Sequence, residues 1–156
     1  MKIVIVTGLS GAGRSSALRA LEDAGHRTID NLPPRLLAAF VELAEASAGG
    51  EDLAIGVDAR GMETPTELIS AHAALRDAGH EVEVLFLTAP DATLIRRFSE
   101  TRRSHPMGEL PDAVTREREW LSPLKPLASH TIDTERLRAR ELRRLVTERY
   151  GAGGRM

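Results

Sequence analysis

The chain has 156 residues, a formal net charge of −2, 42% hydrophobic residues and 28% charged residues. This length and composition predict one packed globular domain and exclude a largely disordered chain. Because the sequence has no cysteine, disulfides, thiolate metal sites and thiol catalysis are excluded, which fits a cytoplasmic protein. The slightly negative charge gives no reason to expect that this chain alone binds RNA. No apolar run is long enough to predict a membrane span.

The predicted elements alternate between short apolar runs and longer stretches with helical periodicity. In chain order they are a strand at 2–7, a helix at 14–24, a strand at 26–29, a helix at 34–47, a strand at 53–57, a helix at 64–78, a strand at 82–88, helices at 91–103 and 110–121, a strand at 130–133 and a helix at 135–149. This order predicts an α/β three-layer sandwich, with about five parallel strands covered by helices on both faces. We expect residues 1–150 to form one domain and residues 151–156 a flexible tail.

The loops that follow the strands are the expected ligand-binding edge. In open parallel sheets, the carboxyl ends of the strands meet at one edge, where ligands bind. The loops after residues 7, 29, 57 and 88 should therefore face one cleft. Asp30 and Asn31 lie in the second of these loops, where either contact with a phosphoryl acceptor or a simple turn ahead of Pro33 explains them.

The first strand runs directly into a glycine-rich loop. Residues 8–15 match the phosphate-binding P-loop pattern G-x-x-x-x-G-K-[ST] at every fixed position except residue 14. A strand, this loop and a following helix together aim backbone N–H groups at an anion, which predicts a P-loop NTPase-type fold. A dinucleotide-binding G-x-G-x-x-G pattern would need glycine at position 16. The predicted nucleotide-binding residues of the loop are Gly8, Leu9, Ser10, Gly11, Ala12, Gly13, Arg14, Ser15 and Ser16.

Two residues of this loop have a predicted chemical role. Ser15 is placed to ligate Mg²⁺ on the β and γ phosphates. Arg14 replaces the usual lysine, in a chain whose basic residues are all arginine except Lys2 and Lys125. Its guanidinium keeps the positive charge but is planar and bulkier than an ammonium group, so we expect binding to survive the replacement better than catalysis.

Asp58 follows the predicted strand at 53–57. This is where a Walker-B carboxylate would hold Mg²⁺ through water, although an aspartate at a turn or helix cap explains it too. The candidate catalytic residues are therefore Arg14 and Asp58, and the candidate metal ligands are Ser15 and Asp58. Arg60, two residues further on, is placed either to reach phosphate or to pair with Asp58.

The helix predicted at 91–103 carries several arginines. They are Arg96, Arg97, Arg102 and Arg103. Helical spacing does not aim all four at one point. By analogy with the lid of small P-loop kinases, we expect Arg102 and Arg103 to contact phosphate, and the other pair to face solvent. His105, beyond them, is expected to be an exposed loop histidine.

Three motifs together resemble one protein family. They are Asp30-Asn31-Leu32-Pro33, Asp58-Ala59-Arg60 and the stretch Leu94-Ile95-Arg96-Arg97-Phe98-Ser99-Glu100-Thr101-Arg102-Arg103-Ser104-His105-Pro106. With the P-loop, they resemble the amino-terminal kinase-like domain of the RapZ/YvcJ nucleotide-binding proteins, the RNase adapter family. The resemblance runs from Met1 to about Tyr150.

The resemblance implies a cytoplasmic regulator that binds and slowly hydrolyses ATP and GTP. It assigns ATP to the P-loop, and it assigns GTP to a second segment that comprises Asp58, Ala59, Arg60 and Gly61. Arg14 stands where the family has lysine. The chain also ends before the family's carboxyl-terminal domain, which carries RNA binding and oligomer contacts in enteric members, so we expect no adapter activity from these residues alone.

Three functions remain open from the sequence. The first is a regulatory ATP- or GTP-binding protein with weak hydrolysis, which acts through a protein partner or as a homo-oligomer. The second is a small-molecule kinase, which the same fold and lid would serve. The third is a nucleotide-binding module that has lost turnover because Arg14 replaces the lysine.

Overall fold

The computed structural model describes residues 1–47 and 51–151. These residues form a five-stranded parallel sheet in the order β2-β3-β1-β4-β5. The strands are β1 (Lys2–Gly8), β2 (Arg27–Ile29), β3 (Leu53–Gly56), β4 (Glu81–Thr88) and β5 (His130–Asp133). The α-helices are α1 (Arg14–Asp23), α2 (Leu37–Ala46), α3 (Thr66–Asp77), α4 (Asp91–Thr101), α5 (Asp112–Leu121) and α6 (Ala139–Tyr150). Short 3-10 helices lie at Pro34–Leu36, Ala59–Gly61 and Ser122–Leu127.

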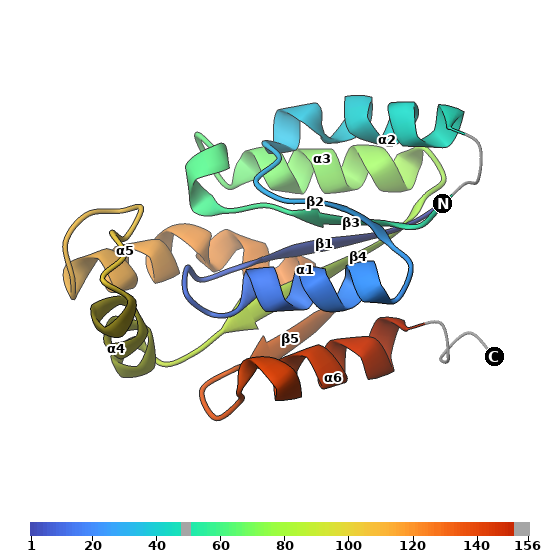
Figure 1. The fold of residues 1–156 in the computed structure, drawn as a ribbon. Helices are drawn as coiled ribbons and strands as arrows, with labels where there is room; N and C mark the ends of the chain where they lie inside the picture. The colour runs from blue at the N-terminus through green and yellow to red at the C-terminus, as the bar shows by residue number, and fades with distance from the viewer. Residues whose placement is uncertain (48–50, 152–156) are drawn as a thin grey trace.

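Helices cover both faces of this sheet. Helices α2 and α3 lie on one face, and α1 and α6 pack together on the other (Figure 1). Helices α4 and α5 lie at the end of the sheet where the loop after β1 turns into α1 (Figure 1). The predicted α/β three-layer sandwich of P-loop type, with its parallel strands, is confirmed.

Strand β1 is the centre of the core. Its residues Ile3, Val4, Ile5 and Val6 are fully buried, as both faces of a central parallel strand require. Ile5 lies opposite Ile55 of β3 and Val84 of β4. Truncation of such a side chain to alanine typically costs about 2–5 kcal/mol. This packing fixes the position of Gly8, where the strand ends and the glycine-rich loop begins.

The elements differ from the sequence prediction mainly at their ends. Helix α4 ends at Thr101 rather than at residue 103, because Arg102 takes a left-handed conformation with φ 55°. Helix α6 begins at Ala139, four residues later than the prediction of 135. The tail predicted at 151–156 lies, apart from Gly151, outside the described residues. No helix in the described part of the chain is long and apolar enough to cross a membrane.

Candidate nucleotide-binding site

The glycine-rich loop depends on glycine at three positions. Gly8, Gly11 and Gly13 have φ angles of 134°, 88° and 116°, which L side chains rarely adopt. A Cβ atom on Gly8 would collide with the backbone of Leu87, and one on Gly13 would lie 2.6 Å from the Leu142 side chain. The loop backbone is therefore packed closely against β4 and α6, and a side chain at Gly8 or Gly13 would force it apart from them.

This wrap leaves a set of backbone donors without acceptors. Within the described residues, no hydrogen bond is made by the backbone N–H groups of Gly11, Gly13, Arg14, Ser15 and Ser16. Two neighbouring groups are satisfied: the Ala12 N–H donates to the Leu9 carbonyl at 3.0 Å, and the Ser10 N–H donates to Glu117. Open donors at the start of a ten-residue helix attract an anion.

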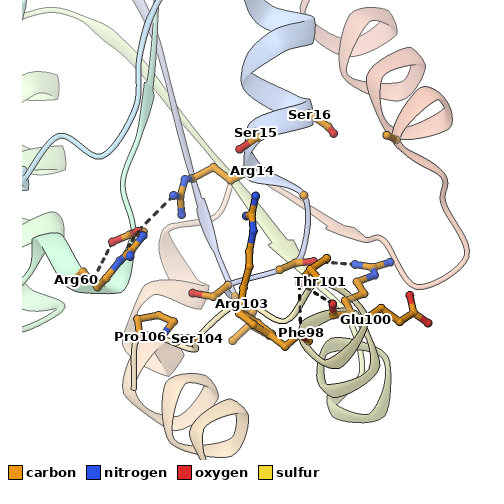
Figure 2. A pocket seen from close by; sticks show the side chains of 17 residues that line it. Arg14, Ser15, Ser16, Arg60, Phe98, Glu100, Thr101, Arg103, Ser104 and Pro106 are labelled. Atoms are coloured by element: carbon orange, nitrogen blue, oxygen red, sulfur yellow. Dashed lines mark hydrogen bonds and ion pairs between the residues drawn. The ribbon is translucent and has the colours of Figure 1, made fainter. Parts of the chain in front are cut away.

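The loop forms one wall of a cleft of about 820 Å³ (Figure 2). The lining residues are Leu9, Ser10, Gly11, Gly13, Arg14, Ser15, Ser16, Asp58, Arg60, Arg97, Phe98, Glu100, Thr101, Arg103, Ser104, Pro106 and Ala139. The cleft thus brings together the P-loop, the segment after β3 and the arginine-rich segment after β4. Of the predicted site residues, the structure places Gly8, Ala12, Ala59, Gly61 and Arg102 outside this lining.

The Arg14 side chain does not point along the loop. Its Nε donates to Asp30 Oδ1 at 2.9 Å, and its Nη2 donates to Asn31 Oδ1 at 3.1 Å and to Asp58 Oδ2 at 3.3 Å. These acceptors lie in the loops after β2 and β3, so Arg14 bridges the P-loop to the neighbouring strand ends. The planar guanidinium makes this possible, because it offers several donors in one fork.

Asp58 lies between two arginines. Its carboxylate accepts from the Arg60 backbone N–H at 2.8 Å and from Arg60 Nη2 at 2.8 Å, in addition to Arg14. Its side chain is 5% exposed. Burial alone would raise the pKa of Asp58, but the hydrogen bonds from Arg60 and the charge of Arg14 outweigh it and lower the pKa below its usual value. Asp58 is thus an ionised carboxylate, and of the two alternatives for Arg60 the structure shows the pairing with Asp58.

Arg97 contacts the loop, although we expected a solvent-facing side chain. Its Nη1 donates to the Gly11 carbonyl at 3.0 Å and to Thr134 Oγ1 at 3.1 Å, and its Nη2 donates to the Thr134 carbonyl at 2.6 Å. Arg97 stands three residues after buried Leu94, so the two side chains lie on the same side of α4. That spacing was the signal that the sequence offered.

The other arginines of this stretch divide differently from the prediction. Arg103 lines the cleft, as expected of a lid residue. Arg102 is exposed and lies outside the lining, and it takes the left-handed conformation that ends α4. Arg96 is exposed and faces Glu100 at 3.9 Å.

A buried carboxylate that was not predicted from the sequence, Glu117, binds the loop at Ser10. Glu117 of α5 accepts from the Ser10 N–H at 2.8 Å and from the Ser10 hydroxyl at 2.6 Å. The Nε2 atom of His105 lies 3.3 Å from Glu117 Oε1, without the alignment of a hydrogen bond. The prediction that His105 is exposed was wrong: it is 6% exposed, because its ring turns inward against Phe98 and Glu117.

Solved structures with similar architecture show the class of fold. A sugar kinase from Janibacter sp. HTCC2649 superposes with a TM-score of 0.63 and 17% identity, over 94% of this chain and 92% of that one. Shikimate kinase from Acinetobacter baumannii, in complex with shikimate, superposes with a TM-score of 0.58 and 18% identity, over 94% and 90% of the two chains. The chain therefore has a P-loop kinase-like fold.

The family is shown by sequence. Residues 1–154 match the RapZ-like N-terminal domain, and the chain belongs to this family. A nucleotide-binding protein from Alkaliphilus oremlandii is 45% identical over 157 aligned positions, which cover 98% of this chain and 54% of that protein. Nucleotide-binding protein NMC0691 from Neisseria meningitidis is 45% identical over 152 positions, covering 95% and 53%. The chain thus spans about half the length of these relatives.

Proposed function

We propose that this domain binds a nucleoside triphosphate, ATP or GTP, with the phosphates against the loop from Gly8 to Ser16. The observation that carries the proposal is the row of backbone N–H groups at Gly11 and at residues 13–16, which have no acceptor in the described part of the chain. They line a cleft with Arg97 and Arg103. Such donors bind phosphate oxygens wherever a P-loop leads into a helix. Relatives that carry the name nucleotide-binding protein support the same function.

The cleft also fits Mg²⁺ bound together with the nucleotide. Ser15 and Asp58 both line it, and a hydroxyl and a carboxylate are the oxygen ligands that Mg²⁺ takes beside phosphates. The ion would neutralise phosphate charge. Asp58 Oδ2 is held by Arg14 and Arg60, so at least one arginine has to release this carboxylate before Asp58 faces a metal. The described residues contain no cluster of three or more acidic or histidine ligands, so the phosphates themselves would complete the coordination.

The proposed role is regulatory, with slow hydrolysis, in the cytoplasm. The arginine at position 14 supports slow turnover, because its Nε and Nη2 donors are committed to Asp30, Asn31 and Asp58. Charge that develops on a phosphoryl group in the transition state then has no mobile cation from residue 14 to follow it. A protein partner or a second copy of the chain would read the nucleotide state.

One observation favours a small-molecule kinase as a second candidate. Asp30 and Asn31 lie beside the P-loop, where Arg14 contacts both, although neither residue is part of the cleft lining. In a kinase, such groups would orient a hydroxyl for attack on the γ phosphate. The third candidate, a module without turnover, requires that Arg14 never leaves Asp30, Asn31 and Asp58.

One experiment separates the candidates. Fluorescent ATP and GTP analogues are titrated into the protein with and without Mg²⁺, and release of ADP or GDP is then followed with and without a panel of hydroxylated metabolites. Slow release that no metabolite stimulates supports the regulatory proposal, and stimulation identifies a kinase. Binding without release identifies a module without turnover. Failure to bind either nucleotide overturns the proposal.

A further inference from the structure

We propose that Glu117 is a positioning residue that couples the lid segment, residues 102–111, to the phosphate loop through Ser10. The inference rests on the proposed function for its consequence, but its physical basis is present without nucleotide. Glu117 is 0% exposed and lies on α5, 107 residues from Ser10 along the chain. One buried side chain therefore ties two cleft-lining segments that the sequence keeps far apart.

On the loop side, Glu117 uses both carboxylate oxygens on one residue. Oε1 accepts from the Ser10 backbone N–H and Oε2 accepts from the Ser10 hydroxyl. The Ser10 amide is thus withheld from any phosphate, while the next amide, Gly11, remains open. Glu117 thus fixes the orientation of the peptide group at Ser10. At the next residue, Gly11, the backbone N–H faces the cleft instead of a buried acceptor.

On the lid side, Glu117 faces His105. The Nδ1 atom of His105 accepts from the Met107 N–H at 3.0 Å, so in the neutral ring the proton sits on Nε2, which lies 3.3 Å from Glu117 Oε1. Its two chain neighbours, Ser104 and Pro106, line the cleft. The buried His105 ring therefore fixes the lid segment to the protein, while the residues on either side of it line the cleft.

The same oxygen, Oε1, meets both partners, which is why the coupling works in both directions. A carboxylate buried this deeply is costly to leave short of donors. The Ser10 N–H is the hydrogen-bond donor to Oε1, and the His105 ring lies beside this oxygen at 3.3 Å without hydrogen-bond alignment. When His105 withdraws, Oε1 loses this close neighbour, and the carboxylate shifts or admits water. When the loop changes its turn at Ser10, the carboxylate moves against His105. A lid that closes over a ligand thereby changes the phosphate loop.

The competing explanation is that Glu117 only satisfies Ser10 and has no influence from the lid. Three variants separate the two. Glu117→Gln keeps the shape and removes the charge, and His105→Phe keeps a ring against Phe98 and removes both nitrogens. Glu119→Gln is the matched control, because Glu119 is an exposed carboxylate on the same helix.

The first readout is amide hydrogen exchange without nucleotide. We expect His105→Phe to accelerate exchange of the Ser10 amide about tenfold, although the substitution lies on the lid, with Glu119→Gln at the wild-type rate. If the Ser10 amide of His105→Phe exchanges as in wild type, the coupling is overturned. This arm remains decisive if Glu117→Gln fails to fold.

The second readout uses ATP and GTP. Bound nucleotide should slow exchange at residues 103–108 in wild type, and Glu117→Gln should lose most of this protection and raise the Kd about tenfold. Undiminished protection in a folded Glu117→Gln protein contradicts the coupling. If wild type binds neither nucleotide, the proposed function fails, and the nucleotide-free measurement still decides the coupling.

Discussion

Arg14→Lys tests what the arginine does in this phosphate loop. Arg14 makes three polar contacts, to Asp30, Asn31 and Asp58, that require a fork of donors on a long side chain. A lysine ammonium is a single point charge on a shorter reach and does not reproduce all three. We therefore expect lysine to release Asp58 in part and to leave a cation free to follow the γ phosphate.

The expected magnitudes follow from these contacts. The Arg14 side chain is 18% exposed and Asp30 is 34% exposed, so solvent weakens their ion pair, and its loss should cost about 1 kcal/mol of unfolding free energy. In a chain of this size, that lowers the Tm by about 3 °C. Against this cost, one repositioned charged hydrogen bond in the transition state should raise hydrolysis about tenfold, which equals about 1.4 kcal/mol.

Steady-state release of ADP and GDP, measured beside the Kd for each triphosphate, decides the outcome. Arg14→Gln is the control, because it also frees Asp58 but supplies no cation. Faster turnover in the lysine variant alone shows that an ammonium is needed. Equal increases in turnover in both variants show that the Arg14–Asp58 contact limits hydrolysis in wild type. If the lysine variant is no faster with either nucleotide, the reasoning is refuted, and the slow step lies in the lid or requires a partner.

Four further predictions follow. Gly13→Asp should raise the Kd for ATP and GTP more than about tenfold by placing a carboxylate at the phosphate donors, whereas Gly79→Asp, also at positive φ but with open space around it, should leave the Kd unchanged. Asp58→Asn should weaken the Mg²⁺ dependence of binding. Because the pKa of Asp58 is lowered on folding, wild type should lose stability as the pH falls below about 4, and the Asp58→Asn variant should lose less over the same pH range. Burial, reinforced by the charge of Glu83, raises the pKa of Tyr150 from 10.0 to about 12. Wild type should therefore lose about 2 kcal/mol of unfolding free energy between pH 10 and pH 12, because the unfolded chain releases this proton first. In denaturant titrations over this pH range, Tyr150→Phe should not show that loss. In filter binding, this chain alone should hold RNA weakly, and submicromolar, salt-sensitive binding would contradict the charge argument.

The fold was predictable because its signals are local. Apolar runs such as Ile3 to Val6 identify central strands, and the glycines at 8, 11 and 13 identify a loop that needs positive φ. The side-chain network around the loop was not predictable, because its pairs are distant in sequence. Arg97 and Gly11 stand 86 residues apart, and Ser10 and Glu117 stand 107 apart. Only the assembled sheet brings α4 and α5 against the first loop.

The direction of Arg14 was hidden for the same reason. The sequence places its charge in the phosphate loop, but the nearest carboxylates come from the ends of two other strands, β2 and β3. The Arg14 guanidinium donates to both Asp30 and Asp58. That these two carboxylates lie close together follows only from the strand order β2-β3-β1.

These contacts change which charges are left for an anion in the cleft. The charge of Arg14 is compensated by Asp30 and Asp58, and that of Arg60 by Asp58. Arg97 donates only to carbonyl and hydroxyl oxygens, and neither Arg97 nor Arg103 forms an ion pair within the described residues, so their charges are not neutralised. Both come from the segment after β4. In the proposed function, the attraction for phosphate would therefore come from the backbone donors of the loop together with Arg97 and Arg103, and not from Arg14. This distribution predicts that nucleotide affinity depends on the lid segment, in which His105 lies against Glu117, the residue that holds Ser10 of the loop.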